Sequence, residues 1–226
     1  YTTPGTVHQM GFAEGVTYVR HNNGVAAYAA VRELGIMSAD IGKNLPEPFP
    51  KDRIKEGIYP GDYWDVINVN DRLLAVEKSA RRIDVLDPNL SWLGSVDLGD
   101  EPRRLLFAKG YGSDDNEDGL ITPEEQRDLV FVAGVGSITI VDATNLTSPV
   151  VIGRIAMKGV VRDLDIDPAK RRLFAGGSWS QQGGGDGFFI IDITKPLATS
   201  VDADADGWDD RVIYKRQYPQ TINGFR

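Results

Sequence analysis

A degenerate repeat limits the fold of this chain more than any other sequence feature. Each copy is an apolar strand, a polar turn and a second apolar strand that ends in aspartate. Three clear copies and one weaker copy, at residues 25–40, close on the four aspartates Asp40, Asp87, Asp142 and Asp192. The spacings between these aspartates are 47, 55 and 50 residues. A period of about 50 residues is typical of one four-stranded β-propeller blade, so we expect an all-β fold of the β-propeller class.

The repeat predicts a single propeller region over residues 1–226. A β-sandwich or a pair of open sheets is the alternative, because evenly spaced strands suit those folds too. Residues 220–226 read as the first strand of a further blade, so we expect the four blades to belong to a larger ring. The expected blades are residues 12–62, 63–100, 101–158 and 159–219.

Two segments carry a resemblance to a known family. Residues 136–153 contain the run Ser-Ile-Thr-Ile-Val-Asp followed by a Ser-Pro turn and a second apolar strand. This pattern resembles the LVIVD type of bacterial β-propeller repeat. Residues 165–176, an Asp-Ile-Asp-Pro turn that leads to the strand Arg-Leu-Phe-Ala-Gly, are similar to the wider family of seven- or eight-bladed propellers of extracellular bacterial proteins. The resemblance implies the architecture but no particular activity, since propellers carry many unrelated functions.

Residues 114–125 fit the calcium-loop pattern D-x-[DN]-x-[DN]-G-x5-E at every position. Gly119 permits the sharp turn that such a loop needs, and Thr122-Pro123 begins a capping box that predicts a short helix. A strand is expected just before this loop, so we read it as an EF-hand-like loop inserted into a blade. The predicted ligands are the side chains of Asp114, Asn116, Asp118 and Glu125, the carbonyl of Leu120, and Thr122 through a water.

A second acidic loop, within residues 202–213, resembles the Asp-rich calcium loops of thrombospondin type 3 and dockerin-like repeats. It departs from the EF-hand pattern at Ile213, where an acid is usual. The resemblance implies that Asp202, Asp204, Asp206, Asp210 and the carbonyl of Trp208 are ligands. We expect Ca²⁺ at both loops in preference to Mg²⁺, which demands octahedral geometry. Alternatively, each loop is a solvated acidic turn that binds nothing.

The charge of the chain is concentrated in these two loops. The formal net charge is -8, and residues 114–125 and 202–210 hold eleven of the 33 acidic residues and no Lys or Arg. The remainder, 22 acids against 25 bases, shows no basic stripe, so a nucleic-acid partner is not expected. No apolar run approaches the ~20 residues of a membrane span. The chain has no cysteine, which excludes disulfides and thiolate metal sites.

These features predict a calcium-binding, non-enzymatic propeller module of a larger extracellular or cell-surface protein, acting in binding, adhesion or scaffolding. The expected partner is another protein chain or the rest of the same polypeptide, with a surface ligand as a further option. The chain starts at Tyr1, which fits a processed chain or a piece of a longer one. The alternatives are a propeller hydrolase or lactonase with a metal in the central channel, and a cofactor-dependent dehydrogenase. With only His8 and His21 present, a zinc site or a catalytic triad is not expected.

Overall fold

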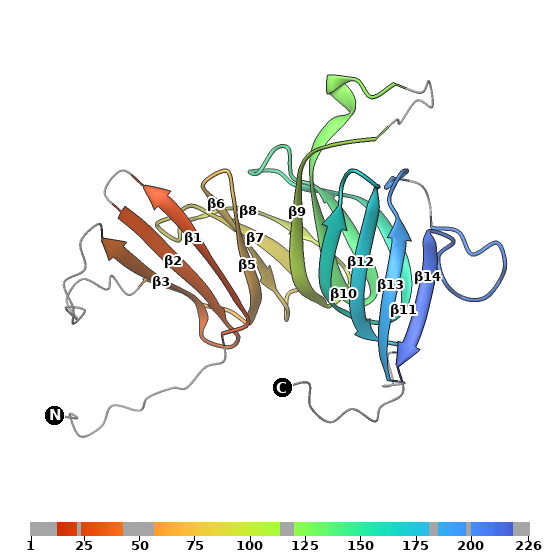
Figure 1. The fold of residues 1–226 in the computed structure, drawn as a ribbon. Coiled ribbons are helices and arrows are strands. Elements are labelled where there is room, and N and C mark those ends of the chain that lie inside the picture. Colours follow the sequence, from red (N-terminus) through yellow and green to blue (C-terminus); the bar gives the residue numbers. More distant parts are fainter. Residues whose placement is uncertain are drawn as a thin grey trace.

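Antiparallel β-strands dominate the computed structural model of this chain (Figure 1). It describes residues 13–21, 24–42, 57–113, 120–180, 185–197 and 200–218. Two sheets have four strands each, in sequence order. The first comprises β1 (Gly15–His21), β2 (Gly24–Val31), β3 (Gly35–Gly42) and β4 (Gly57–Tyr59). The second comprises β5 (Tyr63–Val69), β6 (Arg72–Glu77), β7 (Arg82–Leu86) and β8 (Trp92–Asp97).

The C-terminal half forms a six-stranded arrangement in the order β14-β13-β12-β11-β10-β9. Two of its strands are about three times the usual strand length of 5–6 residues. The sheets follow one another across the molecule from the N-terminal to the C-terminal part (Figure 1). The strands are β9 (Pro102–Gly112), β10 (Gln126–Asp142), β11 (Val150–Asp167), β12 (Arg172–Ser178), β13 (Asp186–Asp192) and β14 (Val212–Tyr218).

The two long strands each serve two pairings. β10 pairs with β9 through residues 126–134 and with β11 through residues 135–142. β11 pairs with β10 through its first half and with β12 through residues 161–167. The amide of Ala143 donates to the carbonyl of Asp128 over 2.7 Å, so the two ends of β10 lie side by side. The strand therefore doubles back on itself near Gly136, whose φ of +84° suits a tight reversal.

Alternating side chains bury both faces of the middle sheets. In β6, Leu73 packs into a cluster with Tyr28 of the first sheet, whereas its neighbour Leu74 packs with Val130 and Val132 of β10. Both leucines are at most 1% exposed, and each contributes about 2 kcal/mol by leaving water. This period-two burial on two faces explains why the strands are continuous apolar runs.

A third apolar cluster joins β10 to β12 and β13. It contains Phe131 and Ile138 from β10, and Leu173 and Phe189 from the following strands. All four side chains are at most 1% exposed. Three cores thus separate successive layers, which is the packing expected of sheets stacked face to face.

Asp65 of β5 links the first strands of three sheets. Its carboxylate accepts the backbone N–H of Leu105 in β9 over 2.8 Å and lies 3.5 Å from the guanidinium of Arg104. On the other side it packs so closely against Gly15 of β1 that a Cβ there would come within 2.1 Å of it. Burial raises the pKa of Asp65, although the bonds from Leu105 and Arg104 act to lower it. The sheets therefore converge along their first strands, as they do in a propeller.

The prediction of an all-β fold with antiparallel four-stranded sheets is confirmed, and the arrangement is propeller-like. The helix expected after Thr122 is a single 3-10 turn over Pro123–Glu125. Residues 220–226, predicted to open a further blade, lie outside the described residues. In the described part of the chain, no helix is long and apolar enough to cross a membrane.

Candidate metal centre

The second acidic loop connects β13 to β14 and is fixed to the body of the protein by Trp208. This side chain is 4% exposed. Its ring lies 5.1 Å from that of Phe189 and 5.3 Å from that of Trp179. Trp179 therefore packs in the same aromatic cluster. The base of the loop is closed by the amide of Asp210, which donates to the carbonyl of Val201 over 2.7 Å.

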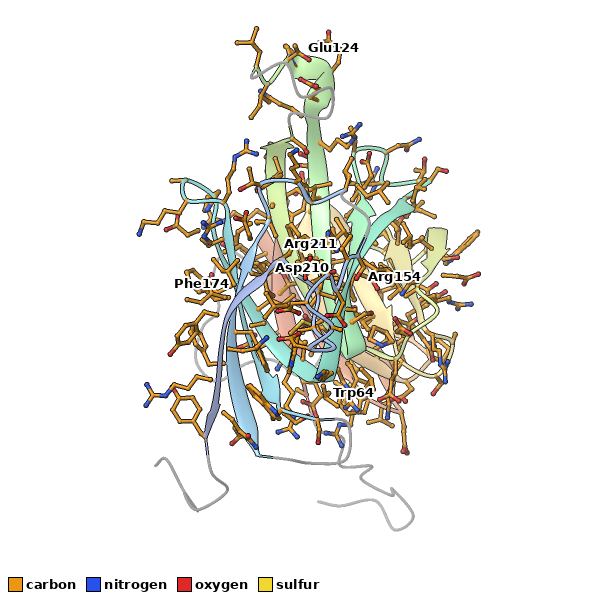
Figure 2. The ribbon with its side chains drawn as sticks, turned by 90° about the vertical axis from the view of Figure 1, so that its right-hand side faces the viewer. Trp64, Glu124, Arg154, Phe174, Asp210 and Arg211 are labelled. Atoms are coloured by element: carbon orange, nitrogen blue, oxygen red, sulfur yellow. The ribbon has the colours of Figure 1, made fainter. Side chains whose placement is uncertain are left out.

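A buried ion pair holds the outgoing side of the loop. The guanidinium of Arg211 binds both carboxylate oxygens of Asp209, at 2.7 and 2.8 Å, and donates to the carbonyl of Arg154 at 2.6 Å. Burial acts to raise the pKa of Asp209, but hydrogen bonds from Arg211 and Ser200 outweigh it and hold that pKa below its ordinary value. Arg211, Asp210 and Arg154 are labelled in Figure 2. Asp209 is therefore a structural anchor.

Three of the predicted ligands of this loop converge. Carboxylate oxygens of Asp202, Asp204 and Asp210 all lie within 4.8 Å of one another, and all three residues are exposed. Each carboxylate also accepts a loop amide, from Gly207, Asp206 and Ala203 respectively. The amides orient the carboxylates, and the three negative charges remain close together. A divalent cation with oxygen ligands would relieve their repulsion.

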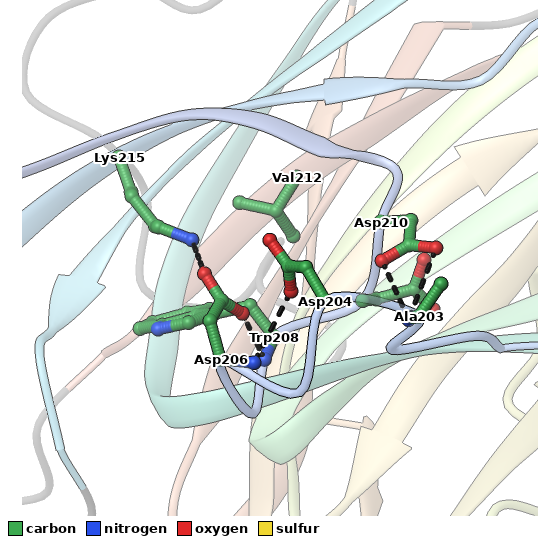
Figure 3. Close-up of a pocket in the computed structure, with 8 residues that line it drawn as sticks. Ala203, Asp204, Asp206, Trp208, Asp210, Val212 and Lys215 are labelled. Carbon is green, nitrogen blue, oxygen red and sulfur yellow. Dashed lines mark hydrogen bonds and ion pairs between the residues drawn. The ribbon is translucent and has the colours of Figure 1, made fainter.

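The fourth predicted side-chain ligand, Asp206, has a cationic partner. Its carboxylate forms an ion pair with Lys215 of β14 and accepts the amide of Trp208 over 2.8 Å (Figure 3). These bonds, that of Lys215 first, lower the pKa of Asp206. Lys158 donates to the carbonyl of the same residue. The sequence did not reveal these two lysines, because strand pairing and sheet packing, and not proximity in sequence, bring them to the loop.

The carboxylates border an open hollow. Its volume is about 340 Å³, and its wall includes the ring of Trp208 and the side chain of Val212. The side chains of Asp204, Asp206 and Asp210 line it (Figure 3). The hollow therefore presents carboxylate oxygens that could bind a cation. Its apolar wall, formed by Trp208 and Val212, is continuous with the aromatic cluster.

The first acidic loop is described only in part. Asp114, Asn116 and Asp118 lie outside the described residues, and Leu120 is exposed. The amide of Thr122 donates to the carboxylate of Glu125 over 2.9 Å, as the predicted capping box requires. The Thr122 hydroxyl donates to the same carboxylate oxygen over 3.2 Å.

The two ends of this insertion are tied together at its base. The amide of Ser113 donates to the carbonyl of Glu125 over 3.1 Å, and the Glu125 side chain is 8% exposed. The hairpin of β9 and β10 that carries the insertion projects beyond the sheets (Figure 1).

No family model matches the chain, and no curated protein matches it. Solved structures resemble it at low identity. Dihydro-heme d1 dehydrogenase NirN, solved in complex with DHE, aligns with 87% of this chain at a TM-score of 0.56 and 13% identity. A functionally unknown protein from Desulfotomaculum acetoxidans DSM 771 aligns with 91% at 0.55 and 11%, and a protein from Lactobacillus plantarum with 85% at 0.52 and 12%.

The chain spans 36%, 56% and 57% of the lengths of these three structures, respectively. Identities this low carry information about the fold alone.

Proposed function

We propose that this chain is a calcium-binding, non-enzymatic, propeller-like module of a larger extracellular or cell-surface protein, with a binding, adhesive or scaffolding role. The observation that carries this proposal is the convergence of the Asp202, Asp204 and Asp210 carboxylates on one loop. Its partners are another protein chain, the rest of the same polypeptide, or a surface ligand.

The donor set suits Ca²⁺. Calcium takes six to eight oxygen ligands in a flexible shell, and exposed loop carboxylates supply several of them. With Lys215 paired to Asp206, the three converging carboxylates are the principal uncompensated charge of the loop. The Trp208 carbonyl and Asp206 would complete the shell, with Lys215 displaced.

Ion binding in this loop would stabilise the sheets as well as the loop. Trp208 belongs to the same apolar cluster as Phe131, Ile138 and Phe189, so ordering the loop fixes one wall of that core. A ligand that binds only the folded state adds stability in proportion to RT ln(1 + [L]/Kd). Calcium is thus proposed as a structural ion. A second Ca²⁺ is proposed for the loop over residues 114–125 from its sequence pattern.

The proposed architecture is a ring of four-stranded blades. The six-stranded arrangement would divide into two blades in the following way. β10 doubles back and supplies two strands of the first blade. β11 then forms the outer strand of that blade with its first half and the inner strand of the next blade with its second half. The bond between Ala143 and Asp128 and the two pairings of β11 support this division. It gives four blades, and the LVIVD-like run at residues 136–153 then lies in the third.

We propose that further blades complete a larger ring. The outer face of β12, β13 and β14 carries Phe174, Phe188 and Tyr214, whose rings contact one another. Tyr214 is 42% exposed. An apolar face of this kind is what a following blade would cover.

The alternative function, a hydrolase or lactonase with a metal in the central channel, has less support. Arg103 and Arg104 lie at the start of β9, and Arg162 lies where β11 begins to pair with β12. The three side chains share one pocket. A cluster of guanidinium groups repels a divalent cation.

Calorimetric titration with CaCl₂ and thermal unfolding test the calcium proposal. For a site with Kd of about 0.1 mM, 10 mM Ca²⁺ should add roughly 2.7 kcal/mol to the free energy of unfolding. The Asp202→Asn/Asp204→Asn variant should lose one of two binding events, and Asp118→Asn should lose the other.

Asp97→Asn, an exposed carboxylate on β8, is the matched control and should keep both events. A wild-type chain with no binding heat and no shift in Tm, or a double variant that retains both events, would refute the proposal.

A further inference from the structure

A cationic pocket lies where the first strands of the sheets begin. It has a volume of about 380 Å³ and is lined by Glu14, Arg32, Trp64, Arg103, Arg104 and Arg162. Four arginines in one pocket are unexpected in a chain whose net charge is -8. Trp64 and Glu124 lie at opposite ends of the molecule (Figure 2), so this pocket is separate from the 114–125 insertion.

The pocket is built by the same local feature in three successive sheets. The register shifts by one residue near the start of β5, near the start of β9 and where β11 begins to pair with β12. These shifts leave Trp64, Arg103 and Arg162, respectively, without a cross-strand partner. Such a bulge re-aims its side chain away from the regular alternation. The three bulge residues thereby line the same pocket. The pocket therefore exists because the same bulge recurs at the equivalent strand position of successive repeats.

Three cations surround the ring of Trp64. The guanidinium carbons of Arg103 and Arg32 lie 4.1 and 4.6 Å from its centroid, and the Lys78 ammonium lies 4.5 Å away. These charges are closer to one another than the ~10 Å screening length at 0.1 M salt. The aromatic ring holds them together through cation–π attraction.

Nearby carboxylates offset only part of this charge. Glu101 pairs with Arg103 at 2.6 Å and with Lys78 at 3.7 Å, and Glu14 pairs with Arg32. Asp65 lies 3.5 Å from Arg104. The Asp62 carboxylate also lies here and accepts the Nε1–H of Trp64 over 3.0 Å. With Arg162 included, five cations therefore face four carboxylates, an excess of one positive charge.

Two guanidinium groups of the pocket have unpaired donors. Within the described residues, Arg162 makes no hydrogen bond or ion pair, and the buried Nε of Arg103 has no hydrogen-bond partner. Guanidinium groups bind carboxylate and phosphate oxygens in bidentate fashion, and the positive excess of the pocket favours an anionic ligand.

We infer that this pocket binds a small polyanion that carries carboxylate or phosphate groups, with Arg103 and Arg162 as its main contacts. The volume lies within the range of small-molecule sites, about 300–1,000 Å³, and suits a compact ligand rather than a polymer. This inference is independent of the calcium proposal, because no residue of either acidic loop lines the pocket.

Isothermal titration in calcium-free buffer tests the inference, with tricarballylate and pyrophosphate as probes. At least one should bind in a one-to-one complex more tightly than inorganic phosphate does, and the tighter of the two identifies the chemistry of the ligand. Arg162→Ala and Arg103→Ala should each weaken binding at least tenfold. Raising NaCl from about 50 to 500 mM should weaken it at least fivefold.

The matched control is Arg216→Ala, which removes an exposed cation from β14 and should change Kd less than twofold. Arg162 is also exposed and has no partner to lose, so its variant should keep the wild-type Tm. Absence of binding by both probes, equal weakening by Arg216→Ala and Arg162→Ala, or binding of an oligoglutamate peptide alone would overturn the inference.

Discussion

Three of the four aspartates that close the repeats act locally, as turn caps. Asp142 and Asp192 each accept the amide of the residue two positions on, at 2.9 and 2.8 Å, and Asp87 accepts the amide of Asn89 at 2.9 Å. This bond is an Asx turn, which reverses the chain at the end of a strand. The acid type repeats because the same turn follows the same strand in these three copies. Asp40, the closing aspartate of the weaker copy, instead lies within β3, opposite Ala26.

A cross-strand arginine gives the closing aspartate a second role. Asp192 pairs with Arg172 at 2.7 Å, and Asp142 pairs with Arg127 at 3.4 Å. Burial acts to raise the pKa of Asp192, but bonds from Thr194 and Arg172 outweigh it and lower the pKa. The ionised carboxylate is therefore the form that stabilises the fold.

Replacement of Asp192 by Asn should make stability less dependent on pH. A depressed carboxyl pKa contributes stability above the unfolded value of about 3.9, and that contribution is lost as the pH falls through the folded value. At pH 7 Asp192→Asn should lower the free energy of unfolding by about 1 kcal/mol, since the pair is partly exposed. The deficit should vanish between about pH 4 and pH 2, as measured by urea unfolding.

Asp97→Asn is again the control and should differ little from wild type across this range. A deficit of Asp192→Asn that persists unchanged at pH 2 would assign it to lost hydrogen bonds rather than to charge.

Among the elements, β11 has the most demanding geometry, since it serves two sheets in one continuous strand. Its middle passes so close to β12 that Gly159 lies against the carbonyl of Ser178, where a Cβ would come within 1.8 Å. The crossing between the two pairings therefore requires glycine, because no backbone atom nearby can move cheaply.

Gly159→Ala should destabilise the protein by about 2–4 kcal/mol through this backbone clash. The matched variant is Gly176→Ala on β12, where an added Cβ meets nothing within 4 Å; it should change stability by less than about 0.5 kcal/mol. Chemical denaturation of both variants decides the comparison. Similar losses in the two variants would contradict the close crossing.

At the scale of the whole molecule, the stacking of sheets buries one face of the last sheet, formed by β12, β13 and β14, more than the other. Phe189 is 1% exposed and packs with Trp179 and Trp208, whereas its neighbour Phe188 lies on the opposite face with Phe174 and Tyr214. One face is core, and the other is an apolar surface of the isolated chain.

Phe189→Ala should therefore cost about 3–5 kcal/mol, the usual range for a buried phenylalanine, and Phe188→Ala about 1 kcal/mol. Phe188→Ala should also lower the fluorescence of a bound hydrophobic dye, because it removes part of the exposed patch. Equal losses of stability would mean that a second layer already covers Phe188.

Positive and negative charges are also separated over the whole molecule. The acids concentrated at residues 114–125 and 202–210 account for the net charge of -8, while arginines gather where the first strands begin. The molecule thus carries opposite potentials in separate places, each suited to a ligand of opposite sign.

The sequence alone determined the features that depend on local patterns. Apolar runs of period two and the recurring aspartates predicted the strands and their four-stranded grouping, because turn chemistry and burial act over a few residues. The candidate ligands Asp202, Asp204 and Asp210 were also predictable, because a loop of alternating aspartates brings its own carboxylates together.

Only the tertiary structure decided which distant residues meet. Lys215 neutralises Asp206 through strand pairing, and Arg32, Trp64, Arg103 and Arg162 share one pocket although up to 130 positions separate them. Their meeting depends on register shifts in three sheets and on the stacking of those sheets. Both are set by long-range packing of the apolar cores, which no short window of sequence contains.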